Sequence, residues 1–281
     1  MIWQCRQQLW DLSHRPLVMG ILNVTPDSFS DGGEYEDPSR AVERAMTMVH
    51  EGADIVDIGG ESTRPGAPEV SQQEEMERVI PVLERLVSAG CSALSVDTRK
   101  VEVARAAVEC GASIINDVEA SRSDLAMWQL VAESGVGYVA MHMQGQPRTM
   151  QHAPNYSEVV SEVYAFFTER LDAMHHSGIK KQQVVLDVGI GFGKDLSHNL
   201  ELLRSIECFG KLERPIMLGV SRKSLFKALL GVEEPSRRLP AGLATALWAV
   251  NQGVKIIRTH DVAETVQALA MWEALQGKNQ L

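Results

Sequence analysis

The chain has 281 residues and a mass of 30.9 kDa, and 44% of its residues are hydrophobic, so it can bury a core of the size found in a single α/β barrel of roughly 250 residues. Its formal net charge of −10 disfavours general binding to nucleic acid or to a membrane surface, and we expect neither partner. The four cysteines form no CxxC pair and the first ten residues do not resemble a secretory leader, so the composition favours a soluble protein of the reducing cytoplasm.

The first fifteen residues precede the main repeating pattern of the chain. Ile2, Trp3, Leu9 and Trp10 flank a polar middle, which is typical of a short hairpin with one apolar face. Such a face needs another surface to cover.

Eight short apolar runs follow, and each stops at a polar or charged residue. A helix-like segment leads from each run to the next, which predicts a (β/α)8 TIM barrel in one domain over residues 1–281. All strands of such a barrel end at one face, so we expect the polar terminators to form one site and the N-terminal hairpin to cover the opposite end. The runs are 17–22 into Asn23, 55–58 with Asp57 near its end, 94–96 into Asp97, 114–115 into Asn116, 139–141 into His142, 184–186 into Asp187, 216–220 into Ser221, and 256–257 into Arg258.

Helices are predicted between the runs from apolar residues at helical spacing and from glycines just past the ends. They cover residues 39–51, 73–89, 100–110, 124–133, 157–176, 197–206, 222–230, 242–251 and 261–275. The connections over 24–38, 59–72 and 143–156 are long. Loops of this length in a compact domain are usually functional lids or simply mobile.

Two of these loops carry residues suited to substrate binding. The loop NVTPDSFSDGG at 23–33 is stiff at Pro26 and loose at its glycines, as expected of a closing lid, although an ordinary loop with turn-capping Asp and Ser side chains explains it equally well. The loop GGESTRPG at 59–66 combines Arg64 with glycines, which suits phosphate oxygens. A lone Arg on a loop is nevertheless more often solvated.

Two helix starts are candidate anion sites. The segment SRKS at 221–224 places two cations in the predicted first turn of a helix, where the helix dipole disfavours them, so either an anionic ligand compensates or both side chains reach water. Arg258 and His260 lie two residues apart and can face the same way beside the next helix, which Asp261 and Glu264 start with a predicted capping box. A single His could instead be structural.

The remaining polar terminators suggest a heterocycle site. Asp57, Asp97, Asn116 and Asp187 come from different strands, and buried carboxylates require donors. A ligand with amino and ring N–H groups would satisfy several of them, and a structural network with Lys223 or backbone amides is the alternative. No HExxH motif or Cys/His cluster indicates catalytic zinc.

Taken in order, these segments resemble the dihydropteroate synthase family of folate biosynthesis over residues 17–275. One departure is Val188, where the family usually has proline, and this puts the stiffness of that turn in doubt. The segments that carry the resemblance are NVTPDSFSDGG at 23–33, GGESTRPGA at 59–67, SVDT at 95–98, IND at 115–117, MHMQG at 141–145, GIGFGK at 189–194, SRKS at 221–224 and RTHD at 258–261.

The resemblance implies a transferase that condenses 6-hydroxymethyl-7,8-dihydropterin diphosphate with 4-aminobenzoate to give 7,8-dihydropteroate and pyrophosphate, with Mg²⁺ as cofactor. By the same resemblance, the pterin is bound by Asp97, Asn116, Asp187 and Lys223 and lined by Met141, Phe192 and Gly219. Asn23 is expected to coordinate Mg²⁺ on the diphosphate, and the residues expected to hold that anion are Thr63, Arg64, Arg258 and His260. The residues expected to border the aminobenzoate are Phe29, Pro65, Ser221, Arg222 and Ser224.

Catalysis on this pattern is expected to follow an SN1-like path, in which pyrophosphate departs before the arylamine attacks the pterin methylene cation. The catalytic residues implied are Asp31, which would stabilise the cation, together with Arg64, Lys223, Arg258 and His260. Sulfonamides, as mimics of 4-aminobenzoate, are expected inhibitors. A homodimer is also expected, with an interface that Leu229, Leu247, Trp248 and Trp272 could supply.

Two other functions stay open on the sequence. A pterin-dependent methyltransferase on a related barrel would share the pterin residues, but it would not need anion sites at Arg64 and at Arg258 with His260. A catalytically silent paralogue would keep the fold and the pterin site. The intact first and second loops argue against it, since only catalysis requires them.

Overall fold

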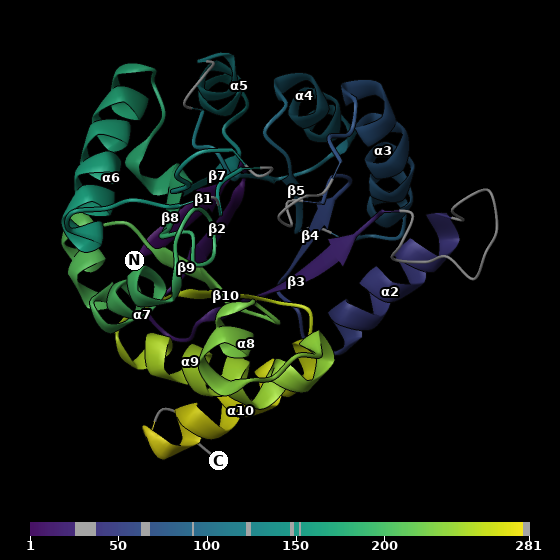
Figure 1. The fold of residues 1–281 in the computed structure, drawn as a ribbon. Helices are drawn as coiled ribbons and strands as arrows, with labels where there is room; N and C mark the ends of the chain where they lie inside the picture. The colour runs from purple at the N-terminus through teal and green to yellow at the C-terminus, as the bar shows by residue number, and fades with distance from the viewer. Residues whose placement is uncertain are drawn as a thin grey trace.

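The structure is a closed barrel of eight parallel strands surrounded by helices, which confirms the predicted fold (Figure 1). The computed structural model describes residues 1–25, 38–62, 68–91, 93–121, 125–146, 149–151 and 153–277. The barrel strands are β3 (Leu17–Asn23), β4 (Ile55–Gly59), β5 (Leu94–Asp97), β6 (Ile114–Asp117), β7 (Gly137–Met141), β8 (Val184–Asp187), β9 (Ile216–Gly219) and β10 (Ile256–Thr259), with β10 paired to β3.

The helices lie outside the barrel, close to their predicted positions. They are α2 (Pro38–His50), α3 (Gln72–Ser88), α4 (Val101–Cys110), α5 (Ala126–Ser134), α6 (Val159–His176), α7 (Leu196–Arg204), α8 (Leu225–Leu230), α9 (Leu239–Asn251) and α10 (Val262–Leu275), with short 3-10 turns η1 (Lys181–Gln183), η2 (Ile206–Leu212) and η3 (Pro235–Arg238). No helix in the described part of the chain is both long and apolar enough to cross a bilayer.

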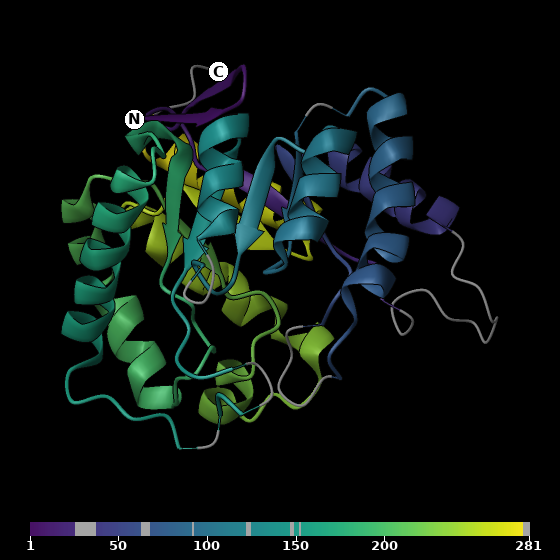
Figure 2. The ribbon, with the colours of Figure 1, turned by 90° about the horizontal axis from the view of Figure 1, so that it is seen from above.

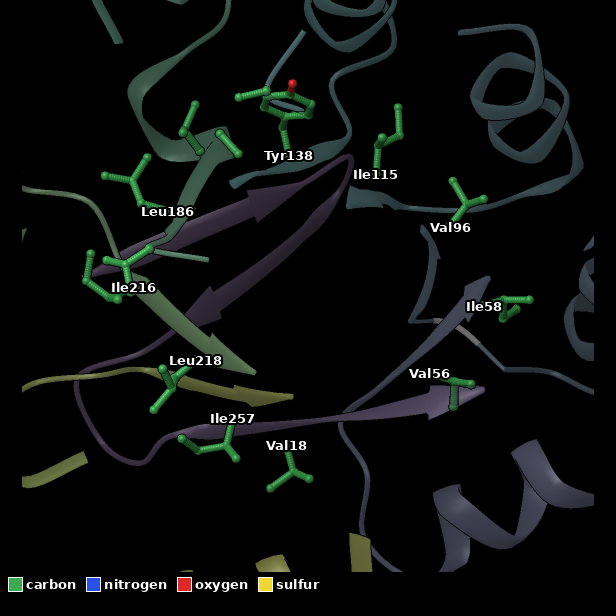
Figure 3. Close-up of a cluster of buried hydrophobic side chains, with 14 of the residues drawn as sticks. Val18, Val56, Ile58, Val96, Ile115, Tyr138, Leu186, Ile216, Leu218 and Ile257 are labelled. Atoms are coloured by element: carbon green, nitrogen blue, oxygen red, sulfur yellow. The ribbon is translucent and has the colours of Figure 1, made fainter. Parts of the chain in front are cut away.

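Seven of the eight barrel strands divide their apolar side chains between two hydrophobic clusters, because successive residues of a strand point to opposite faces. On β3, Leu17 and Met19 join a cluster inside the barrel, whereas Val18 and Leu22 join the larger cluster between barrel and helices. Figure 3 shows this outer cluster, with Val18, Val56 and Ile257 pointing away from the barrel axis. The same alternation therefore directs the inward positions at the strand ends into the carboxyl-terminal mouth.

The N-terminal hairpin lies across the other end of the barrel, as predicted (Figure 2). It consists of β1 (Ile2–Cys5) and β2 (Gln8–Asp11). Trp3 is fully buried against the inner cluster, and its indole N–H donates to the Gln183 carbonyl at 2.9 Å. A Cβ on Gly137, the first residue of β7, would lie 2.5 Å from Cys5 Sγ, so the close approach of the hairpin requires glycine there. The hairpin closes this end and leaves the mouth for the site.

Candidate active site

The mouth of the barrel is lined by the residues at the inward strand ends. The strand register places Asn23 beside Gly59, Gly59 beside Asp97, and Asp97 beside Asn116. Across the barrel, Met141 lies beside Asp187 and Gly219 beside Arg258. The structure thus brings together, from different strands, the residues expected to surround the pterin.

Arg258 connects three of these polar side chains. Its Nε donates to Asp57 Oδ2 at 2.6 Å, and its Nη2 donates to Asp97 Oδ2 at 2.7 Å. Asp57 Oδ2 also accepts from Asn116 Nδ2 at 2.9 Å. Asp57 is fully buried, and these charge-assisted bonds to Oδ2 compensate part of its desolvation, because its Oδ1 has no hydrogen-bond partner among the described residues. For Asp57 and Asp97, Arg258 therefore provides the structural network, whereas the sequence had suggested Lys223 or backbone amides as the alternative to a ligand.

The mouth perturbs the titration of its charged groups. Burial raises the pKa of Asp97 above its usual range, and the nearby Asp57 carboxylate raises it further, whereas Arg258 opposes both effects. Burial lowers the pKa of Arg258, but the Asp57 and Asp97 carboxylates outweigh it and raise that pKa overall. Arg258 therefore stays a cation, and further hydrogen-bond donors would stabilise the charged form of Asp97.

Lys223 lies on the other side of the mouth, next to Asp187 and Phe192. Desolvation lowers its pKa from 10.5 to about 8, although the Asp187 charge opposes this shift. Its Nζ lies 3.9 Å from the centroid of the Phe192 ring, within the range of a cation–π contact. Burial also raises the pKa of Asp187, whose Oδ1 accepts from the Gly189 amide at 2.8 Å. This pair can offer a ligand both an acceptor and a cation.

Apolar side chains and one glycine complete the mouth of the barrel. Phe192 packs against a cluster that contains Met141, Met143, Met150 and Val118. Gly219 has no side chain, and a Cβ there would lie 3.9 Å from Asp187 Oδ2 and 3.8 Å from Arg258 Cβ. Flat surface beside paired donors and acceptors suits a planar heterocycle.

The loop that carries Phe192 packs tightly against the segment after β7. Gly189 has φ +70°, and a Cβ on it would lie 1.9 Å from the His142 carbonyl oxygen. The buried Lys194 ammonium donates to the carbonyls of Gly189 and Phe192, both at 2.9 Å, and lies 3.0 Å from His142 Nδ1. This role of Lys194 could not be predicted, because nothing in the local sequence distinguishes it from a solvated lysine.

His142 is a correction to the expected ring of terminators. Its position follows the inward Met141, so its side chain points outward, where it is buried with its ring centroid 4.8 Å from that of Phe166 on α6. The alternation along the strand could have shown that Met141 points inward and His142 outward, because neighbouring residues point to opposite faces. His142 lies outside the mouth, against the helix layer.

A second corner of the site forms where β9 and β10 end. Ser221 Oγ lies 3.0 Å from His260 Nδ1, and the Arg222 guanidinium forms an ion pair with Asp261. Ser224 is exposed just before α8. The structure therefore places His260, Ser221 and Arg222 together beside Arg258, in one corner, where the sequence suggested two separate anion sites.

Two predictions about this corner are wrong. Arg222 and Lys223 do not open a helix, because α8 begins at Leu225, and Arg222 has a left-handed φ of 60°. Its carbonyl accepts from Arg238 Nη1 at 2.8 Å instead of from a helical amide. The capping box at Asp261 is also absent from α10, because this carboxylate bonds Arg222 and does not cap the helix. The charge of Arg222 is therefore compensated by the Asp261 carboxylate, and Arg222 does not lie in the first turn of a helix.

Five residues expected in the site fall outside the described part of the chain. They are Phe29 and Asp31 of the first loop, and Thr63, Arg64 and Pro65 of the second. Asn23 and Gly59, from which these loops leave, are neighbours at the mouth.

The chain is similar to known proteins over the whole barrel. The family described as "Pterin binding enzyme" matches residues 19–260. The dihydropteroate synthase of Escherichia coli K12 is 50% identical over 264 residues, which cover 94% of this chain and 93% of that protein. The Yersinia pestis dihydropteroate synthase, solved with a sulfonamide drug complex, has a TM-score of 0.91 at 45% identity and covers 99% of this chain and 100% of its own. The Xanthomonas albilineans dihydropteroate synthase in complex with 7,8-dihydropteroate has a TM-score of 0.89 at 43% identity, with 98% and 99% covered.

Proposed function

The chain belongs to the family of pterin-binding enzymes, and on this premise we propose that it is a dihydropteroate synthase, a transferase of folate biosynthesis. It condenses 6-hydroxymethyl-7,8-dihydropterin diphosphate with 4-aminobenzoate and releases pyrophosphate. The observation that carries this proposal is the mouth itself, where the Asp57, Asp97 and Asp187 carboxylates and the Asn116 amide lie with the cations Arg258 and Lys223.

The pterin ring is bound in the mouth by complementary hydrogen bonds. Its amino and ring N–H groups donate to Asp97 and Asp187, whose burial makes additional donors favourable. Asn116 and Lys223 serve its acceptor atoms, and Phe192 and Met141 contact its faces. The absence of a side chain at Gly219 leaves room for the bicyclic ring between Asp187 and Arg258.

The diphosphate is bound at the side of the mouth where β3, β4 and β10 end. Arg258 and His260 provide donors there, and Arg64 and Thr63 are expected to join them from the second loop. Asn23 ends β3 at this edge, and its amide oxygen is a hard donor of the kind Mg²⁺ accepts. An Mg²⁺ ion held there with the substrate phosphates would neutralise part of their charge.

The reaction follows an SN1-like path. Arg258 and His260 stabilise the negative charge that develops on the departing pyrophosphate. Asp31 of the first loop is expected to stabilise the pterin methylene cation that remains. The amine of 4-aminobenzoate then attacks the methylene carbon and loses a proton. Ser221, Arg222 and Ser224 border the aminobenzoate, and Phe29 and Pro65 are expected to join them.

The direct test is product formation by the purified protein. Dihydropterin diphosphate, 4-aminobenzoate and Mg²⁺ should give dihydropteroate. Pterin binding without product would identify a silent paralogue, and methyl transfer from methyltetrahydrofolate would identify a methyltransferase. Sulfonamides should compete with 4-aminobenzoate, and inhibition that does not depend on its concentration would contradict the proposed subsite.

Two further properties belong to the proposal. The enzyme acts in the cytoplasm, where its four free cysteines remain reduced. It forms a homodimer through apolar side chains of α8, α9 and α10, because Leu229, Trp248, Met271 and Leu275 are exposed there. Leu247 and Trp272 pack partly against the core and contribute less to this face than the sequence suggested. A monomer mass by light scattering at micromolar concentration would contradict the dimer.

A further inference from the structure

Asp57 is a buried carboxylate that binds two residues of the proposed pterin and diphosphate sites without belonging to either site. Its side chain is fully buried on β4. Its Oδ2 accepts from Arg258 Nε at 2.6 Å and from Asn116 Nδ2 at 2.9 Å. The register pairs Asp57 with Ser95, two residues below the pairing of Gly59 with Asp97, so Asp57 lies one layer deeper than the residues a ligand can contact.

Arg258 is therefore bound by two carboxylates that differ in their access to substrate. The Asp97 side chain, which accepts from Nη2 at 2.7 Å, is 12% exposed, whereas Asp57 is 0% exposed. When a pterin ring donates its N–H groups to Asp97, this carboxylate shares its charge with the ligand. The bond between Asp57 and Arg258 Nε is out of the ligand's reach and does not change.

From this geometry we propose that Asp57 is a positioning residue that holds Arg258 by Nε, so that the Nη atoms are directed to the diphosphate when the pterin ring binds Asp97. The inference rests on the proposed function. Asp57 also fixes the Asn116 amide, and through these two bonds it links the ring-binding and diphosphate-binding halves of the site.

A purely electrostatic role of Asp57 predicts the opposite effect of removing it. A buried negative charge beside the diphosphate site opposes an anion, so neutralising Asp57 would tighten diphosphate binding if position did not matter. In the positioning role, the freed guanidinium turns toward Asp97, its remaining carboxylate, and diphosphate binding weakens. The sign of the change therefore separates the two roles.

The experiment compares two ligands that differ only in the diphosphate. Calorimetry without 4-aminobenzoate measures the dissociation constants of 6-hydroxymethyl-7,8-dihydropterin diphosphate and of the corresponding alcohol, for the wild type, Asp57→Asn and Asp57→Ala. The ratio of the two constants isolates the diphosphate contribution from any loss of ring binding through Asn116. We expect the advantage of the diphosphate to fall about tenfold in Asp57→Ala, the effect of losing one charge-assisted bond. The fall should be smaller in Asp57→Asn, whose amide oxygen can still accept from Nε.

Asp117→Asn is the matched control. Asp117 is also a buried strand-end carboxylate, but it bonds Tyr138 and Ser121 on the outer side of the barrel. The Asp117→Asn variant should be less stable than the wild type but should keep the wild-type ratio of the two dissociation constants. An unchanged or increased advantage of the diphosphate in Asp57→Ala would overturn the inference. If Asp57→Ala does not fold, Asp57→Leu decides the matter in the same way, because its side chain is close in size to Asp but cannot accept from Nε. If the wild type binds neither ligand, the proposed function fails with it.

Discussion

Removal of the Arg258 guanidinium should have a large effect on both stability and catalysis. Arg258→Ala leaves Asp57 and Asp97 without their cationic partner at positions that are 0% and 12% exposed. Breaking a buried ion pair by removing one partner costs roughly 3–5 kcal/mol, and we expect a loss of this size in the free energy of unfolding near neutral pH. In kcat/KM we expect a loss of more than about tenfold, or about 1.4 kcal/mol of transition-state stabilisation.

The stability loss should depend on pH with a defined sign. Arg258 lowers the pKa of Asp97, so its removal moves this pKa further above the value in the unfolded chain, and the folded state then binds more protons than the unfolded state. Stability of the variant relative to the wild type should therefore recover as pH falls and Asp97 becomes protonated. Urea unfolding of the two proteins at several pH values measures this difference. A loss that is equal at acidic and alkaline pH, or wild-type stability throughout, would refute the reasoning.

Three further predictions test separate parts of the site. Lys223→Ala should lose more than about tenfold in kcat/KM. The wild-type kcat/KM should fall as pH rises through about 8, where Lys223 loses its proton. In Lys223→Arg this alkaline fall should move to higher pH, and a fall at the wild-type pH would assign it to another group. Gly189→Ala should destabilise the protein by about 1–3 kcal/mol, because the new Cβ would lie 1.9 Å from a carbonyl oxygen. The control Gly231→Ala is also at φ +70° but in open space, and it should cost less. Equal shifts of the melting temperature in the two variants would exclude the clash. Tyr138→Phe should lose about 1–3 kcal/mol in urea unfolding because Asp117 Oδ2 loses a donor at 2.7 Å, with wild-type kcat/KM; a large kinetic defect would connect this network to the mouth.

Local sequence patterns were sufficient to predict the barrel and most of its mouth. Runs such as 17–22 and 184–186 end at Asn23 and Asp187, and each strand was identified by short-range hydrophobicity and by the polar residue at its end. The strand period of two then decides which end residues point inward, as with Met141 and not His142. These features need no knowledge of distant residues.

Only the tertiary structure could decide which residues far apart in the sequence form pairs. Arg258 and Asp57 are 201 positions apart, and either of them could have paired elsewhere as far as the local sequence indicates. The pair of Arg222 with Asp261 replaced an expected helix cap, because a cation brought close by the fold competes with a backbone amide for the carboxylate. Closure of the barrel places these groups in one desolvated mouth, and it is this shared burial that fixes which charges pair and how far their pKa values shift.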